Sequence, residues 1–318
     1  MLAAVSLYGC SAHAATIQNS DPSKVRIVTS DIPRFWKAFD DAQKSDDPAQ
    51  VYQAEYFDGG SAGVRGFTPD RLRSPQHLAE VIAKVHGYYA ASRPYMAQLE
   101  REKPQIYADL KRYKTLYPQA TFPDVYIVVG AMNSAGTSVD GVGLILGAEM
   151  LSRPPGYAKL LPPQNAQIVK TPDSLPATIA HEFTHYNQDG YSNQLLGAAI
   201  REGTADFMAE LVDARAVTQT QWTFGCAHEG ALFKQFQAQM HTTDSDVVTN
   251  WLYSYDPGPL GAPPFIGYWL GSRIAQTYYD THGRSRKAIA DLLQVRDYEA
   301  LFQASGYPEK RPACVPPR

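Results

Sequence analysis

Apolar residues recur at helical spacing along residues 20–120 of the chain. We expect this region to be mainly helical, with a glycine-rich break at residues 59–66. Asp31 can cap the first helix, and Pro33 is tolerated in its first turn. The stripes that carry the pattern are Ile32, Phe35, Trp36 and Phe39, then Leu78, Val81, Ile82 and Val85, then Leu99, Ile106, Leu110 and Tyr113.

The pattern changes after residue 120. Two runs rich in β-branched and aliphatic residues, 125–129 and 142–146, are typical of strands. Residues 133–138 between them are rich in turn-forming types, so we expect the two runs to form a hairpin.

Helical spacing returns after a proline-rich stretch at residues 154–163. Ser174 can cap a helix that has Pro176 near its start and stops at Gly190. A second helix is expected at about 194–214, and others at 229–240, 268–279 and 285–293. The predicted class is α+β, with a helical part at 20–120 and a second part at 121–318. One compact unit is the alternative.

Composition excludes several functional classes. The chain has 318 residues, a net charge of −3, 44% hydrophobic and 19% charged residues. This balance is ordinary for a folded domain and gives no reason to expect nucleic acid as a partner. No apolar run approaches the roughly 20 residues that span a bilayer, so we expect no membrane span. The oligomeric state is left open.

Residues 1–19 resemble a processing segment of an exported bacterial protein. Ala12-His13-Ala14 is a small-residue cleavage site that would leave Ala15 at the new N-terminus. Residues 7–10 resemble a lipoprotein box that ends in Cys10, the residue that would carry a lipid anchor. Either signal predicts the periplasm, the cell envelope or secretion. The alternative is a cytosolic protein with an apolar first strand.

The remaining cysteines are Cys226 and Cys314. An even pair in an oxidising compartment can form a disulfide, here one that would hold the C-terminal tail. Two unrelated free thiols are the alternative, because sequence does not give the distance between them.

The strongest chemical signal is His181-Glu182-Phe183-Thr184-His185. Two histidines four apart on a helix point from the same face, so one zinc ion can bind both imidazoles. Glu182 beside the first histidine can act as a general base toward water. The motif lies within a helical pattern and has apolar neighbours, as expected of a helix packed in a core.

Glu202 is the candidate for the third metal ligand. Sixteen residues separate it from His185, enough for a turn and a returning helix. Three protein ligands leave a fourth position open, as a catalytic zinc site requires. Asp206 lies one helical turn after Glu202 and is the candidate acceptor for the second ring N–H of His181. The alternative is a surface helix with solvated histidines and a plain surface aspartate.

These residues resemble the gluzincin class of metallopeptidases. The chain is also similar to a family of predicted zinc-dependent proteases related to bacterial gliding-motility lipoproteins. The spacing to the third ligand is shorter than in thermolysin, which separates the chain from the best-known gluzincin. The matching stretches are residues 35–36, 56–61, 117–118, 122–123, 126–133, 136–137, 143–149, 181–185 and 267–271.

The resemblance implies a zincin-like catalytic core, in which a small sheet with an edge hairpin packs with two metal-ligand helices. It implies one Zn²⁺ ion and a peptide or protein substrate, which would pair with the 142–146 strand as the sheet edge. Similar enzymes add a donor at the oxyanion; the candidates are Tyr268, which we prefer, and Tyr255, His228 and His241. A packed core tyrosine is the alternative for Tyr268.

The sequence therefore predicts an exported zinc metallopeptidase. Two alternatives stay open. One is a zinc hydrolase that acts on a non-peptide amide or ester. The other is a cell-envelope lipoprotein in which the zinc site is structural or vestigial.

Overall fold

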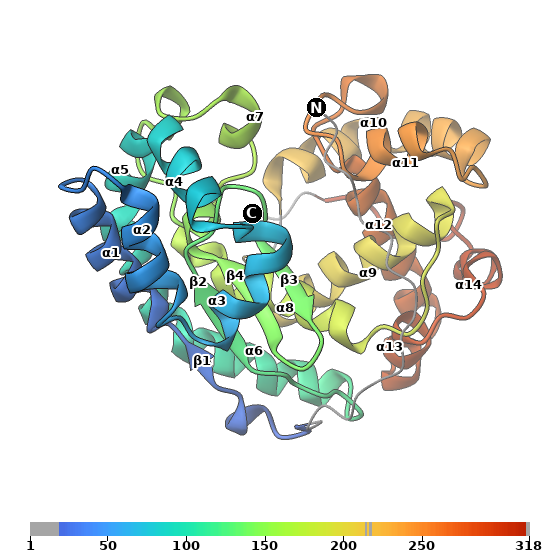
Figure 1. Ribbon diagram of the computed structural model, residues 1–318. Coiled ribbons are helices and arrows are strands. Elements are labelled where there is room, and N and C mark those ends of the chain that lie inside the picture. The colour runs from blue at the N-terminus through green and yellow to red at the C-terminus, as the bar shows by residue number, and fades with distance from the viewer. Residues whose placement is uncertain (1–18, 214, 216–217, 316–318) are drawn as a thin grey trace.

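The computed structural model describes residues 19–213, 215 and 218–315. The α+β class is confirmed, because the described chain is mainly helical and carries one small mixed sheet (Figure 1). The predicted processing segment, with Cys10 and Ala15, lies almost wholly outside the described residues.

The strands and helices follow one another in an order that matches the expected helical and β-rich regions. The strands are β1 (Ile27–Val28), β2 (Val125–Val128), β3 (Gly136–Val139) and β4 (Gly143–Gly147). The α-helices are α1 (Asp31–Ala42), α2 (Pro48–Tyr52), α3 (Ala62–Phe67), α4 (Pro75–Lys84), α5 (His86–Met96), α6 (Lys103–Leu116), α7 (Pro163–Ala166), α8 (Leu175–Asn187), α9 (Leu195–Val212), α10 (Gln219–Gln239), α11 (Ser245–Leu252), α12 (Ile266–Thr281), α13 (Arg286–Leu293) and α14 (Tyr298–Ser305).

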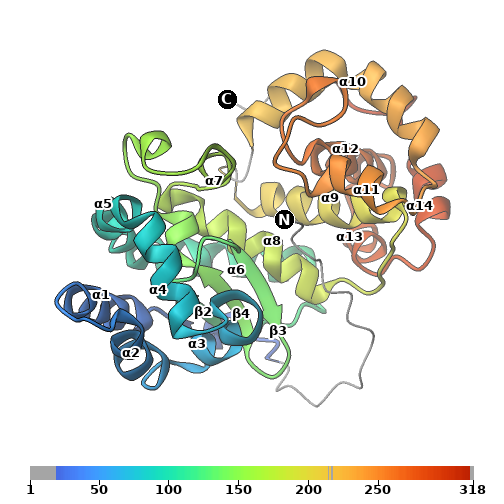
Figure 2. The same ribbon diagram turned by 45° about the horizontal axis from the view of Figure 1, so that its top comes forward.

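The chain is arranged in two halves on either side of α8. The sheet and helices α1 to α7 lie on the left in Figures 1 and 2, and α9 to α14 lie on the right. Helix α8 contacts β3, β4 and α6 on one side and α9 on the other. One continuous apolar core extends from Phe35 in α1 to Phe302 in α14. The domain boundary near residue 120 stays a prediction.

The predicted hairpin between residues 125–129 and 142–146 is wrong. Strands β2 and β4 are parallel neighbours in a sheet of order β1-β2-β4-β3, and the hairpin is formed by β3 and β4. The 142–146 run is therefore not the sheet edge; β3 is. The four residues of β2 are all buried, which is typical of a parallel strand covered on both faces. Strand β3 lies in the turn-rich stretch at residues 133–138, and its sequence Gly136-Thr137-Ser138 lacks the apolar alternation that predicts a strand.

The predicted glycine-rich break contains helix α3, whose first turn is capped by the Ser61 hydroxyl accepting from the Gly63 N–H at 3.0 Å. A Cβ at Gly63 would lie 2.4 Å from Tyr126 Cβ of β2, and one at Gly66 would lie 2.9 Å from Ile145 Cδ1 of β4. The glycines therefore let α3 lie directly on the sheet face opposite α8, rather than interrupting the helix.

Neither predicted cap makes a side-chain capping bond, although Ser174 does occupy the N-cap position of α8. Asp31 starts α1, but its buried carboxylate accepts a hydrogen bond from the Ser61 N–H at 3.0 Å. The Ser174 hydroxyl donates to the Thr171 carbonyl at 2.6 Å and does not cap α8. In both cases a neighbouring segment offers the side chain another partner.

A buried carboxylate orders the segment that leads from β2 toward β3. Glu149 is fully buried and accepts hydrogen bonds from the N–H groups of Gly130, at 2.6 Å, and Met132, at 3.1 Å. Burial raises the pKa of Glu149 to about 7 although both bonds lower it. The carboxylate thus takes the place of a strand partner for backbone that has left the sheet.

Helices α9 and α12 meet at a glycine contact. A Cβ at Gly203 would lie 2.1 Å from the Gly271 carbonyl carbon, and a Cβ at Gly271 would lie 1.8 Å from the Ala199 carbonyl oxygen. Without side chains at these positions the two backbones touch. The contact fixes α9 at the residue after Glu202, and fixes α12 one turn beyond Tyr268.

Cys226 of α10 and Cys314 of the C-terminal tail form a disulfide with Cα atoms 5.3 Å apart. Of the two alternatives, the disulfide is the one in the structure. It closes a long loop that contains α11 to α14. In the loop-entropy model, such a crosslink lowers the entropy of the unfolded chain and stabilises the folded protein by about 4 to 5 kcal/mol. Among the described residues, no helix combines the length and the apolar character needed to cross a bilayer.

The glycine contact predicts that Gly203→Ala will destabilise the protein by about 3 kcal/mol, because the methyl group overlaps the backbone of α12. Gly230→Ala in α10 is the matched control. A Cβ there meets nothing within 4 Å, so the free energy of unfolding of this variant should rise by about 0.5–1 kcal/mol, because alanine has the better helix propensity. Urea unfolding of both variants measures the difference. Equal shifts would contradict the contact.

Candidate metal centre

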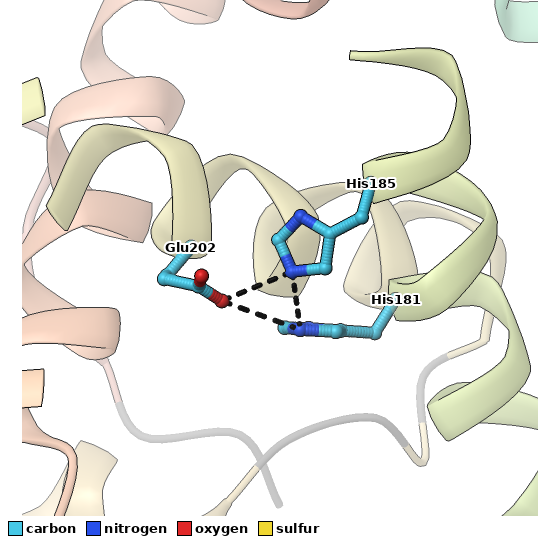
Figure 3. A group of neighbouring side chains, drawn as sticks. All are labelled: His181, His185 and Glu202. Atoms are coloured by element: carbon cyan, nitrogen blue, oxygen red, sulfur yellow. Dashed lines mark hydrogen bonds and ion pairs between the residues drawn. The ribbon is translucent and has the colours of Figure 1, made fainter. Parts of the chain in front are cut away.

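Helix α8 has one apolar face and one polar face. Leu175, Ile179 and Phe183 recur every four residues and are buried, with Phe183 packed edge-on against Phe122 at 5.5 Å between ring centres. His181 and His185 also lie four apart and point together toward α9 (Figure 3). The buried face holds α8 against the core while both imidazoles remain 13–16% exposed.

Helix α9 is buried on almost every side, so its side chains are held firmly. Its first N–H groups, those of Leu195 and Leu196, donate to the carbonyls of Thr242 and Met240 at 3.0 and 2.8 Å. Glu202 and Asp206 lie one turn apart on the side that faces α8. Glu202 is 10% exposed in its side chain and Asp206 is 31% exposed.

The structure brings His181, His185 and Glu202 together (Figure 3). The two Nε2 atoms are 3.0 Å apart. Glu202 Oε2 lies 3.0 Å from Nε2 of His185 and 3.6 Å from Nε2 of His181. In a tetrahedral zinc site with bonds of 2.0–2.1 Å, neighbouring ligand atoms are about 3.3 Å apart. The triangle therefore has the size that a small tetrahedral cation requires.

The other ring nitrogens have partners that set the tautomers. His181 Nδ1 donates to Asp206 Oδ1 at 2.8 Å, as predicted for Asp206. Gln188 donates through Nε2 to the Arg201 carbonyl at 2.8 Å, so its Oε1 faces His185 Nδ1, also at 2.8 Å. Each Nδ1 must therefore carry the proton, and each neutral imidazole turns an Nε2 lone pair toward the other.

When both imidazoles are neutral, three acceptor atoms converge with no hydrogen to share among them, and they repel one another unless a positive charge lies between them. Burial lowers the pKa of His181, but hydrogen bonds to Asp206 and Glu202 outweigh burial and raise it to about 10. Without a metal, a proton on His181 Nε2 supplies the positive charge, and a metal ion would take the place of that proton. Burial would raise the pKa of Glu202, yet the two histidines hold it well below its usual value. The donor set and its electrostatics fit a metal cation, and the three residues can hold one.

Glu182 lies against strand β3 of the sheet. A Cβ at Gly136 of β3 would lie 2.8 Å from Glu182 Oε1, so the carboxylate rests directly on the edge strand. Its negative charge contributes to the raised pKa of His181, which places it near the metal ligands. The predicted base therefore lies close to both the candidate metal ligands and β3.

Tyr268 of α12 is the only one of the four oxyanion candidates that contacts a predicted ligand. Its ring lies parallel to that of His181, with an interplanar angle of 4° and 6.1 Å between centres, and burial together with the nearby carboxylate of Glu202 raises the pKa of its hydroxyl. Tyr255 reaches Tyr268 through Phe265.

The two histidine candidates lie elsewhere. His228 stacks on Phe224, at 4.2 Å between ring centres. His241 faces Glu299, with 3.8 Å between His241 Nδ1 and a carboxylate oxygen of Glu299.

Several residues around the centre were missed from sequence. Gln188 follows His185 by three residues, a helical spacing that could have identified it. Arg201 precedes Glu202, and its Nη1 lies 3.4 Å from Glu202 Oε1. Tyr253 packs edge-on against Tyr268 at 6.4 Å. The sequence does not place Gly136 or Tyr253 at the metal centre, because only folding brings β3 and the α11–α12 connection to α8 and α9.

The comparisons with known proteins identify a family. The family model described as gliding motility protein GldB matches residues 16–309, which is nine-tenths of the chain. No curated protein and no solved structure matches the chain. The match extends across both halves of the fold and includes every residue of the candidate metal centre. The chain belongs to the GldB family of gliding-motility lipoproteins.

Proposed function

We propose that the protein is an exported zinc-dependent metallopeptidase with a gluzincin-like centre, anchored through Cys10. The observation that carries the proposal is the triangle of His181, His185 and Glu202, with both histidine tautomers set so that their lone pairs converge. Glu182 adds a reason to infer catalysis, because a structural zinc site needs ligands but no adjacent carboxylate base.

A zinc ion held by these residues would supply Lewis acidity and an activated water near neutral pH. Glu182 would accept the proton of that water as it attacks the carbonyl carbon, and would return the proton to the departing nitrogen. Asp206 and Gln188 would hold the two imidazoles in their ligand tautomers throughout.

Tyr268 is the proposed donor to the developing oxyanion. Burial and the nearby carboxylate of Glu202 raise its pKa well above the usual value, so its hydroxyl stays protonated and able to donate. The hydroxyl would have to point toward the carbonyl oxygen of the substrate to donate to it.

The sheet edge supports a peptide substrate. β3 pairs only with β4 among the described strands, so its other side offers unpaired backbone groups. An extended peptide could add to that side as a further strand, which would place its backbone beside Glu182. Helix α8 under a small sheet with an antiparallel edge strand is the arrangement that we propose as zincin-like.

A second candidate is a non-enzymatic lipoprotein of the gliding machinery, with the metal centre as a structural or vestigial site. Membership of the GldB family favours this candidate. Glu182 favours the enzyme. Digestion of a peptide library, with and without a chelator, separates the two.

We predict that the purified protein holds about one zinc per chain, and that Glu182→Gln keeps the zinc but loses peptide hydrolysis by about 10²-fold or more, because the base is removed and the ligands are not. Metal analysis and peptide digestion measure the two effects. Glu80→Gln, at an exposed position of α4, makes the same chemical change away from the centre. It should leave both the zinc content and the rate of peptide hydrolysis unchanged. A chain without zinc, or a fully active Glu182→Gln, would refute the peptidase.

The carboxylate and amide that orient the histidines generate a second prediction. Asp206→Ala and Gln188→Ala should each weaken zinc affinity about 10–100-fold, because an imidazole that loses its Nδ1 partner is free to rotate or change tautomer. Asp206→Asn keeps an acceptor oxygen and should recover most of the affinity. Competition with a chelating dye measures all three. Glu202→Ala should weaken binding further; unchanged affinity would remove Glu202 from the ligand set.

A further inference from the structure

Aromatic rings gather on the connection between α11 and α12. We call Tyr253, Tyr255 and Phe265 the aromatic wall. Tyr253 and Tyr255 are 38% and 40% exposed, which places both among the exposed large hydrophobic residues of the described chain. Single exposed aromatics are ordinary, but a cluster of them on one short segment marks a binding surface.

The aromatic wall is continuous with the metal centre through ring contacts. Tyr255 meets Phe265 at 5.5 Å between ring centres, and Phe265 meets Tyr268 at 5.8 Å. Tyr253 meets Tyr268 at 6.4 Å, and Tyr268 lies against His181 at 6.1 Å. Tyr253 is therefore joined to His181 by two successive ring contacts, and Tyr255 by three.

The backbone of the wall is strained and held in place. Phe265 has φ +63° and Leu260 has φ +60°, a left-handed conformation that is rare for residues other than glycine. Gln221 Nε2 donates to the Pro264 carbonyl at 2.7 Å, and the Gly258 N–H donates to the Ala262 carbonyl at 2.8 Å. Such strain persists where the surroundings enforce it, and it concentrates at ligand-binding segments.

We propose that the aromatic wall is a substrate subsite that receives an aromatic side chain beside the bond presented to the metal centre. The inference rests on the proposed peptidase and deepens it by naming the class of side chain that is preferred.

The geometry of the rings favours an aromatic occupant. Tyr253 stands at 86° to Tyr268, and Tyr255 at 88° to Phe265, so ring edges and faces alternate along the wall. A further ring can add to such an arrangement edge-to-face or offset-stacked. A glycan would need donors for its hydroxyls, whereas prolines at 257, 259, 263 and 264 remove four backbone N–H groups from this segment.

The test compares two metal-binding probes that differ only in the side chain, N-acetyl-phenylalanine hydroxamate and N-acetyl-glycine hydroxamate. Calorimetry on the zinc-loaded chain should show that the phenylalanine probe binds roughly tenfold more tightly, or better, because its ring moves out of water and packs on the aromatic wall. Tyr253→Ala and Tyr255→Ala should each reduce that ratio at least threefold.

Matched variants separate the ring from other effects. Tyr253→Phe keeps the ring and should keep the ratio. Tyr95→Ala, a half-exposed tyrosine on α5 in the other half of the chain, should also leave the ratio unchanged.

Equal affinities for the two probes, or no binding of either, overturn the subsite. Tighter binding of a chitin trisaccharide than of the phenylalanine probe, lost in Tyr253→Ala, overturns it in favour of a glycan. If the phenylalanine probe binds more tightly than the glycine probe as expected, but the protein cleaves no peptide, the subsite is supported and the proposed peptidase is refuted. The two outcomes can be told apart because probe binding needs no turnover.

Discussion

Two imidazole Nε2 atoms and a carboxylate oxygen lie within 3.6 Å of one another, and they repel one another unless a proton or a metal cation lies between them. Asp206 and Gln188 prevent either histidine from escaping by a change of tautomer. The apolar face of α8 and the buried α9 prevent the helices from separating. The arrangement becomes favourable when a cation neutralises it, so its geometry is evidence for a metal-binding role.

The two halves of the chain contribute different parts of the centre. The sheet half brings Gly136 of β3 to Glu182, and Glu149 orders the segment before that strand. The helical half brings Glu202, and also Tyr268, through the glycine contact between α9 and α12. Helix α8, which carries the histidines, lies between the two halves (Figures 1 and 2), and the ring of His181 lies against that of Tyr268 from the helical half.

The disulfide and the family membership both favour an exported protein. A crosslink between α10 and the C-terminal tail is expected outside the reducing cytosol, and membership of a lipoprotein family accords with export. The convergent ligand atoms and Glu182 indicate the chemistry of the centre, because a closed structural metal site needs no carboxylate base beside its ligands.

The sequence by itself determined what depends on helical periodicity. The four-residue spacing of His181 and His185 and that of Glu202 and Asp206 each predicted a shared helix face, and the structure places all four together. Only the tertiary structure decided the strand order, the edge role of β3, and the arrival of Tyr253 at Tyr268. These features depend on contacts between segments far apart in the chain. Local spacing carries no information about them, because the energy of such a contact exists only after both segments have packed on α8 and α9.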